Sequence, residues 1–327
     1  MVDLHLHFDG SLPVEAVWEQ AKKQGVDLGV ESLTDLKEKL SISEDCKSLN
    51  EYLEKFDFPL SVLQTIDGIS ECMQALIAKL VEEEMVYAEI RFAPQLHCLK
   101  GLTQDEVVQA AIDGVKKACE GQEIKIKLIL CCMRSDDNAK QNLETVTLTK
   151  KYLGDIVCAC DLAGAEAIFK TSTFEELFAY AKSLEVPYTI HAGEADGPSS
   201  IYDALRFGTK RIGHGVHCIE DKSLVELLFT QGITLECCPI SNLHTKTVID
   251  MKDHPIMDLL QKGLKVTINS DNRTVSDTNV AKEVDAVRKS LGLTLEQELQ
   301  LYINALDAAF IKLEEKNVLK EKIKSRF

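Results

Sequence analysis

The sequence VPYTIHAGE, residues 186–194, contains a short β-branched run that ends in a cluster of polar residues. Further apolar runs of this kind recur at 2–7, 86–92, 125–131, 156–161, 211–214, 233–238 and 264–270. Helical periodicity or turn residues separate them, and several expected helices begin with a Thr-x-x-Glu/Gln capping box, at Thr103, Thr173 and Thr294. Strands that alternate with helices form a parallel sheet, so these units predict an α/β fold, a (β/α)8 TIM barrel.

Two segments exceed this repeat. Residues 8–85 separate the first run from the second and contain helical patterns near 13–24, 31–41, 46–56 and 68–84, which is more than one crossover helix requires. We expect these extra helices to cover one end of the barrel. The segment 279–327 is expected to form helices that close the barrel and face solvent. The whole chain, 1–327, is expected to be a single domain.

Composition limits the possible classes of protein. With 45% hydrophobic and 28% charged residues, the 327-residue chain has enough apolar material for a large core. The net charge of −16 disfavours nucleic acid and anionic membranes as partners. No run approaches about 18 apolar residues and no basic leader precedes the first strand, so we expect a cytoplasmic protein. The 11 cysteines, an odd number, favour reduced thiols, including the pairs at 131–132 and 237–238.

Polar side chains follow several of the runs at their carboxyl ends, the edge at which barrels of this kind have their active sites. His5 and His7 alternate on one strand and therefore face the same way. His191, His214 and Asp271 lie at the ends of three other runs. Three imidazoles and one carboxylate suit zinc and leave a position open for water, so the pattern predicts a metal site. We interpret the remaining histidines as structural or exposed: His97, His217, His244 and His254.

The ordered motifs resemble those of the adenosine deaminase family, in the amidohydrolase superfamily. The resemblance covers essentially the whole chain. An HxH motif alone is shared by the entire superfamily, whereas the combination of HAGE with GHG is typical of the adenosine and related aminopurine deaminases. The matching motifs are HLHFDG at 5–10, RFAP at 91–94, CCMR at 131–134, DLAG at 161–164, HAGE at 191–194, GHG at 213–215, CPISN at 238–242 and the strand end at Asp271.

The resemblance implies a TIM barrel with one zinc ion per chain and a purine nucleoside as substrate. The implied reaction is hydrolytic deamination of adenosine and 2′-deoxyadenosine to inosine and 2′-deoxyinosine, with release of ammonia, by a zinc-activated water that attacks C6. The implied metal ligands are His5, His7, His191 and Asp271. The implied catalytic groups are Glu194, as the general acid that protonates N1, and His214 with Asp271, beside the attacking water. The implied substrate contacts are His7, Asp9 for the 5′-hydroxyl, Gly164 for N3 and Asn272 for N7.

Two positions depart from the family pattern. Asn272 stands where the best-known members have a second aspartate that meets N7, and Ala165 follows Gly164 where an acidic or amide residue is usual. An amide can donate an N–H to the N7 lone pair, so we expect Asn272 to keep this contact. The alternative is that Asn272 turns away and caps the loop that begins at Arg273.

Three functions are compatible with the sequence. Deamination of adenosine and 2′-deoxyadenosine is the first. The second is deamination of a related aminopurine, either adenine or an N6-substituted or modified adenine nucleoside, although Asp9 favours a substrate with a ribose. The third, a non-catalytic binding protein, predicts a broken metal or acid position, and the sequence contains none.

Overall fold

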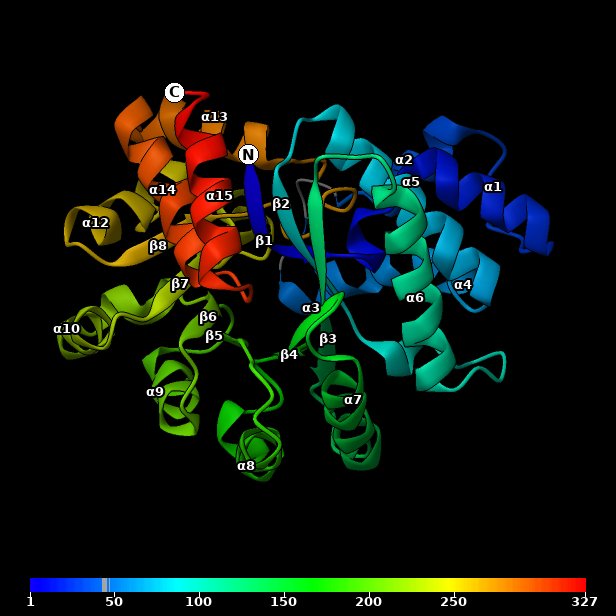
Figure 1. Cartoon of the computed structure of the whole chain (residues 1–327), viewed down its shortest axis with the longest axis horizontal. Helices are drawn as coiled ribbons and strands as arrows, with labels where there is room; N and C mark the ends of the chain where they lie inside the picture. Colours follow the sequence, from blue (N-terminus) through cyan, green and yellow to red (C-terminus); the bar gives the residue numbers. More distant parts are fainter. Residues whose placement is uncertain (43–45, 47) are drawn as a thin grey trace.

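The computed structural model describes residues 1–42, 46 and 48–327, and Figure 1 shows its arrangement of strands surrounded by helices. All strand pairs are parallel and form two four-stranded sheets, ordered β1-β2-β3-β4 and β5-β6-β7-β8. The strands are β1 (Val2–His7), β2 (Tyr87–Phe92), β3 (Lys125–Met133), β4 (Val157–Ala163), β5 (Ile190–Ala192), β6 (Arg211–His214), β7 (Thr234–Cys237) and β8 (Lys265–Ile268).

Backbone hydrogen bonds join the two sheets at both seams. At the first seam, the His7 N–H donates to the Asp271 carbonyl and the Asp271 N–H donates to the His5 carbonyl, both at 2.8 Å. At the second seam, the Cys160 N–H donates to the Pro187 carbonyl at 2.9 Å, beside a parallel bridge to Tyr188. These bonds bring the strands together in the order that a barrel requires, and the predicted α/β fold with parallel strands is confirmed.

Helices follow the strands, and the extra helices predicted after the first strand are confirmed. In the described part of the segment between β1 and β2 lie α1 (Val14–Gln24), α2 (Leu33–Leu40), α3 (Leu49–Leu53), α4 (Asp57–Val62) and α5 (Ile66–Glu82). No helix was expected at α4, and residue 47 of the expected 46–56 helix lies outside the described residues. The others are α6 (Gln104–Cys119), α7 (Ala139–Tyr152), α8 (Glu175–Ser183), α9 (Pro198–Phe207), α10 (Lys222–Gln231), α11 (Pro239–His244), α12 (Ile256–Gln261), α13 (Val280–Leu291), α14 (Leu295–Ala308) and α15 (Leu313–Lys324).

Two of the three predicted capping boxes are confirmed. Thr103 caps α6 and Thr294 caps α14, each with the reciprocal bond from the residue three positions on. The box at Thr173 is wrong, because Thr173 lies inside a 3-10 helix (Thr171–Phe174) and its hydroxyl donates to the Lys170 carbonyl at 2.8 Å. That local hydrogen bond uses the hydroxyl, and α8 begins at Glu175 without a side-chain cap.

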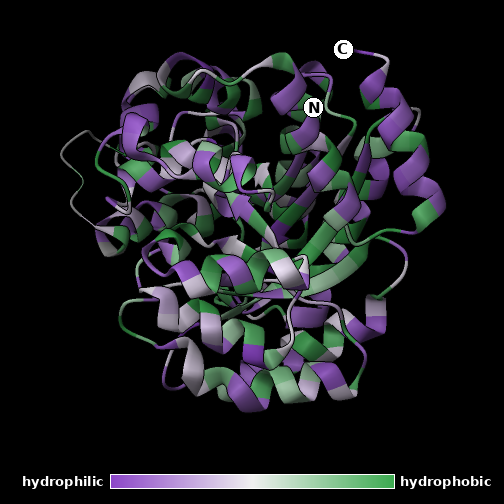
Figure 2. Cartoon of the chain, turned by 90° about the vertical axis from the view of Figure 1, so that its left-hand side faces the viewer, coloured by the Kyte–Doolittle hydropathy of each residue, from purple (hydrophilic) through white to green (hydrophobic). Residues whose placement is uncertain are grey.

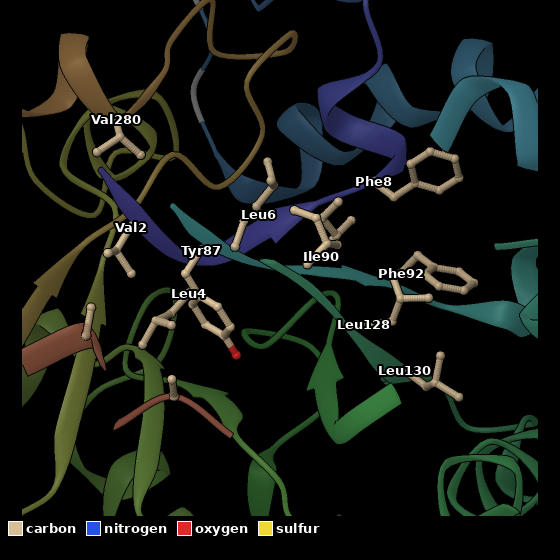
Figure 3. Packing of buried hydrophobic residues seen from close by; sticks show 14 of the residues in the cluster. Val2, Leu4, Leu6, Phe8, Tyr87, Ile90, Phe92, Leu128, Leu130 and Val280 are labelled. Atoms are coloured by element: carbon tan, nitrogen blue, oxygen red, sulfur yellow. The ribbon is translucent and has the colours of Figure 1, made fainter. Parts of the chain in front are cut away.

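The hydrophobic core lies between the strands and the surrounding helices. Figure 3 shows Leu4, Leu6, Ile90 and Leu128 packed along adjacent strands, and all four are fully buried. Parallel strands are buried on both faces, which explains why these runs are almost continuously apolar. In Figure 2, the surrounding helices alternate between hydrophilic and hydrophobic residues, as expected for helices with one face on the core.

Charged side chains cross the space enclosed by the strands. The guanidinium of Arg91 contacts Asp161 at 2.9 Å and Glu236 at 2.8 Å, and that of Arg211 contacts Glu236 and Glu89, both at 2.7 Å. These residues come from β2, β4, β6 and β7, so the contacts pass through the barrel interior. Their side chains are at most 2% exposed, and each charge meets an opposite one, as burial demands.

The C-terminal segment covers the barrel at the end opposite the predicted site. The backbone N–H of Phe310 donates to the Glu89 carboxylate at 2.8 Å, and the Arg211 guanidinium lies 4.2 Å from the centre of the Phe310 ring. Asn304 of α14 donates to the Val266 carbonyl of β8 at 2.9 Å. The expectation that the last helices close the barrel is therefore confirmed.

Two expectations from composition can be compared with the structure. The cysteines are all free thiols, and the pairs at 131–132 and 237–238 are buried. No helix within the described part of the chain has the length and apolar character needed to cross a membrane.

Candidate active site

The four predicted metal ligands meet at the carboxyl ends of β1, β5 and β8. The Nε2 atom of His7 lies 3.2 Å from Nε2 of His191 and 3.4 Å from Oδ1 of Asp271. Nε2 of His5 lies 3.6 Å from the same Asp271 oxygen. Because β1 adjoins β8 in the ring, side chains 260 residues or more apart in the chain converge on one point.

Buried carboxylates contact the outer nitrogens of two of these imidazoles. Nδ1 of His5 lies 2.9 Å from Glu236, and Nδ1 of His191 lies 2.9 Å from Asp161. The Arg91 guanidinium contacts both carboxylates, and its positive charge favours their ionised forms. A proton on each Nδ1 leaves the Nε2 lone pair directed at the cluster, the arrangement that supporting carboxylates give to metal-binding histidines.

The donor set fits a divalent metal ion. Burial lowers the pKa values of His5 and His7 well below the usual range, so both imidazoles are neutral and can ligate. Nε2 of His5 is buried and has no hydrogen-bond partner within the described residues. His5, His7 and His191 each place one nitrogen within 4.8 Å of the others. Three imidazoles beside the Asp271 carboxylate are a zinc-type set.

The backbone around the cluster is shaped for close approach. A Cβ atom on Gly213 would lie 3.0 Å from Cε1 of His5 and 3.2 Å from His191, so only glycine leaves these rings in place. His214 and Asp271 both have positive φ angles, 59° and 55°, in the left-handed region that non-glycine residues rarely adopt. Such strain is typical of functional positions, and here it occurs at two strand ends that carry predicted site residues.

A cavity opens from the cluster toward the helices inserted after β1. Tyr52 and Leu53 of α3 and Leu60 of α4 form part of its apolar wall. The Tyr52 hydroxyl lies 2.7 Å from the Ser276 hydroxyl, which ties the insertion to the loop after β8. The expectation that the extra helices cover one end of the barrel is therefore confirmed. The predicted site residues that line the cavity are His7, Asp9, Gly164, His191, Glu194, His214, Asp271 and Asn272, and His5 lies fully buried beneath them.

Glu194 and His214 face each other in this cavity. Oε2 of Glu194 lies 3.5 Å from Nε2 of His214, and the two side chains are 6% and 1% exposed. Burial, reinforced by the nearby Asp271 and Glu166 carboxylates, raises the pKa of Glu194 well above its usual range. This shift favours the protonated form of Glu194, the form that the general-acid prediction requires.

A second carboxylate, missed in the sequence, holds the segment that carries Glu194. Glu166 is buried and accepts hydrogen bonds from the backbone N–H groups of residues 193–196, at 2.7, 2.9, 2.8 and 3.3 Å. The Ser200 hydroxyl donates to the same carboxylate at 2.5 Å. One side chain therefore fixes the backbone of the whole loop after β5.

The predicted substrate-binding residues occupy the cavity wall in different ways. Burial raises the pKa of Asp9 to about 6. Gly164 has a φ of +108°, which presents its backbone to the cavity in a conformation suited to glycine. The Asn272 amide donates to the Asp271 carboxylate at 2.8 Å, and its oxygen is buried without a hydrogen-bond partner in the described part of the chain. The Asn272 side chain thus lies toward Asp271, and one of its two N–H groups is used there.

Several residues around the site had no role assigned from the sequence. Asp161 and Glu236 are charged residues within apolar strands, and that contrast was an available signal. Glu166 and the cavity-lining Asp57 stand in segments without any pattern that would mark them. His254, interpreted as structural, is buried and bonds to Asn242, which in turn bonds to His214.

Comparisons with known proteins agree with this geometry. The family profile described as adenosine deaminase matches residues 1–326. Adenosine deaminase of Haemophilus ducreyi is 44% identical over 331 residues, which cover 100% of this chain and 96% of the relative. Adenine deaminase from Arthrobacter aurescens superposes with a TM-score of 0.91 at 27% identity, covering 99% and 98% of the two chains. The N6-mAMP deaminase of Arabidopsis superposes with a TM-score of 0.87 at 26% identity, covering 99% and 97%. The chain belongs to the adenosine deaminase family.

Proposed function

We propose that this protein deaminates adenosine and 2′-deoxyadenosine hydrolytically, giving inosine and 2′-deoxyinosine with release of ammonia. The observation that carries the proposal is the position of Glu194, a buried proton donor whose carboxyl faces His214 in the cavity beside the histidine and aspartate cluster. Addition of water to a purine C=N bond requires a group that gives a proton and a set of metal ligands beside it, and one cavity wall carries both.

The cofactor in this proposal is zinc. His5, His7, His191 and Asp271 would hold one ion per chain, because their donor atoms converge and burial keeps the imidazoles of His5 and His7 neutral. Zinc held there supplies an activated water as the nucleophile at neutral pH.

The chain's own residues position the purine and move the proton. Glu194 gives its proton to N1, which makes C6 more electrophilic and avoids a full negative charge on the ring. His214, whose Nε2 lies 3.5 Å from the Glu194 carboxyl, orients the attacking water. Asp9 accepts a hydrogen bond from the 5′-hydroxyl, and the backbone of Gly164 meets N3. Asn272 offers its remaining N–H to N7.

Charge in the cavity favours a nucleoside over a nucleotide. Among the residues that the structure describes, the cavity wall carries four carboxyl groups, those of Asp9, Asp57, Glu194 and Asp271, and no lysine or arginine. A 5′-phosphate would meet no cationic partner among these described lining residues and would lie near the acids. The pairing of Asp9 with a ribose hydroxyl also disfavours free adenine as the substrate. Adenine and N6-substituted or modified adenine nucleosides stay as the second candidate, because the structural neighbours include an adenine deaminase and an N6-mAMP deaminase.

A spectrophotometric assay tests the proposal. Adenosine, 2′-deoxyadenosine, adenine, N6-methyladenosine and AMP are each added to the zinc-loaded protein, and the loss of absorbance in the purine band is followed. We expect turnover of the first two substrates and much slower turnover of the other three. Turnover confined to adenine or to the N6-methyl nucleoside would replace the proposal by the second candidate.

We also propose that the whole chain, 1–327, acts as a single deaminase domain, because elements from both ends contribute to one site: β1 through His5 and His7, and the residues after β8 through Asp271. The cytoplasmic location expected from the sequence stays a prediction.

A further inference from the structure

A line of hydrogen bonds leads from His214 to the first residue of α12. Nδ1 of His214 lies 3.2 Å from Nδ2 of Asn242 on α11, and Oδ1 of Asn242 lies 3.1 Å from Nε2 of His254. The backbone N–H of Ile256 then donates to Nδ1 of His254 at 3.2 Å. The three side chains are 1%, 0% and 3% exposed, so water does not compete for these contacts.

The backbone end of this line sets the direction of every hydrogen bond in it. An amide N–H can only donate, so Nδ1 of His254 must accept, and a neutral His254 then carries its proton on Nε2. That proton is directed at Asn242, whose oxygen must accept it. The Asn242 NH₂ group is thereby turned toward His214, where it donates to Nδ1. In the reverse orientation of the amide, the Asn242 NH₂ group would face the Nε2–H of His254. Two hydrogen-bond donors would then meet without an acceptor.

We propose that Asn242 and His254 are positioning residues that hold His214 in the tautomer with its proton on Nε2. Nε2 is the atom that faces Glu194, at 3.5 Å. His214 therefore presents a hydrogen-bond donor to the cavity and has no lone pair there. This inference rests on the proposed function, in which His214 orients the attacking water, and it assigns that role to donation of an N–H.

The tautomer also explains why His214 can lie inside the cluster without serving as a ligand. One nitrogen of His214 lies within 4.8 Å of ligand atoms of His5, Cys238 and Asp271, so distance alone would allow it to bind the same ion. A nitrogen that carries a proton cannot coordinate a metal. Donation from Asn242 to the outer nitrogen thus keeps this imidazole free for the reaction.

Nitrogen-15 NMR of the zinc-loaded protein, labelled at histidine and free of substrate, measures the tautomer directly. The His214 signals are identified as those missing from His214→Gln. We expect the chemical shift of a protonated Nε2 and an unprotonated Nδ1. A protonated Nδ1 in the wild type would overturn the proposal, whatever the activity of the enzyme.

Two substitutions test the direction of the line. Asn242→Asp keeps the shape of the side chain and, when ionised, accepts only, so it should draw the His214 proton to Nδ1 and lower kcat by about 10²- to 10⁴-fold, with a smaller change in KM. Asn304→Asp is the matched control, because Asn304 is a buried amide that donates to Val266 at the other end of β8. The control should leave the His214 shifts and kcat unchanged.

Two substitutions of His254, the last side chain of the line, test whether its N–H donor is what matters. His254→Gln retains an N–H that can donate to Asn242 and should keep the wild-type tautomer, whereas His254→Leu has no donor and should yield a mixture of tautomers with lower kcat. Wild-type shifts and wild-type kcat in both Asn242→Asp and His254→Leu would overturn the proposal. A wild type that turns over no adenine nucleoside yet has Nε2–H on His214 would instead contradict the proposed function alone.

Discussion

Replacement of Glu166 by Gln should loosen the loop that carries Glu194 while leaving every other group of the site in place. One oxygen of the Glu166 carboxylate accepts the N–H groups of Glu194, Ala195 and Asp196, and the other accepts those of Gly193 and the Ser200 hydroxyl. A glutamine has a single acceptor oxygen, so its NH₂ group must face donors on one side.

The magnitude follows from counting these bonds. The best orientation of Gln places its oxygen on the three N–H groups and its NH₂ toward Gly193 and Ser200. The Ser200 hydroxyl can rotate to accept, but the Gly193 N–H stays buried and unpaired, at a cost of about 1–3 kcal/mol. The other bonds lose their charge assistance, about 1 kcal/mol each, and the smaller desolvation cost of an uncharged side chain offsets part of this. We expect a loss of about 3 kcal/mol in stability.

The effect on catalysis comes through the position of Glu194. A shift of about 1 Å in a group that contacts the reacting atoms can lower the rate by about 10²-fold, so kcat of Glu166→Gln should fall by about that factor. Urea denaturation and steady-state kinetics on adenosine measure the two effects. Ser200→Ala is the matched control, since it removes one hydroxyl bond to the same carboxylate and should cost about 1 kcal/mol with kcat within a few-fold. The reasoning is refuted if Glu166→Gln is as stable and as active as Ser200→Ala.

Further predictions concern the metal, the acid, the purine contact and pH. His191→Ala should lose zinc, measured by mass spectrometry, with the fold retained by circular dichroism; a fully loaded, active variant would contradict the ligand assignment. Glu194→Gln should keep zinc and substrate binding and lose about 10²- to 10⁴-fold in kcat, and near-normal turnover would mean another acid. If Asn272 contacts N7, the loss in kcat/KM on changing adenosine to 7-deazaadenosine should shrink in Asn272→Ala; an equal loss in both proteins contradicts the contact. Burial lowers the pKa of His97 from 6.5 to about 4. Between these two pH values the unfolded chain binds a proton that the folded chain does not. The free energy of unfolding therefore falls by about 1.4 kcal/mol per pH unit as the pH is lowered through this range. His97→Asn, which can keep the bond to the Leu63 carbonyl, should reduce this slope in urea midpoints measured from pH 6.5 to 4, and parallel curves would contradict it.

Sequence patterns located the strands well, and their errors have local causes. The run at 211–214 matches β6 in full because turn residues border it on both sides. The run at 186–191 predicted too early a start, since Pro187 has no N–H for a ladder and regular pairing begins at Ile190. β3 and β4 extend to Met133 and Ala163, two residues beyond the predicted ends, because pairing between them continues.

The convergence of the proposed metal ligands could be predicted because they are unusual residues at recurrent positions, whereas the residues that support them could not. The contacts between His5 and Glu236 and between Asp161 and His191 span distant parts of the chain and exist only once the strands are arranged in a ring. Glu166 acts through backbone N–H groups, which carry no sequence signal. A hydrogen-bond partner that depends on ring closure is invisible to periodicity and spacing.

The residue beside the outer nitrogen of each imidazole distinguishes the proposed metal ligands His5 and His191 from the proposed catalytic group His214. His5 and His191 have carboxylates 2.9 Å from Nδ1, which favour a proton on that nitrogen and leave a lone pair on the inner nitrogen for a metal ion. His214 has an amide NH₂ group beside Nδ1, which donates and leaves the proton on the inner nitrogen. Three similar side chains, each at the end of a strand, therefore acquire two different chemical roles. The difference arises from whether the residue behind each ring accepts or donates, and that residue comes from a different strand or helix in each case.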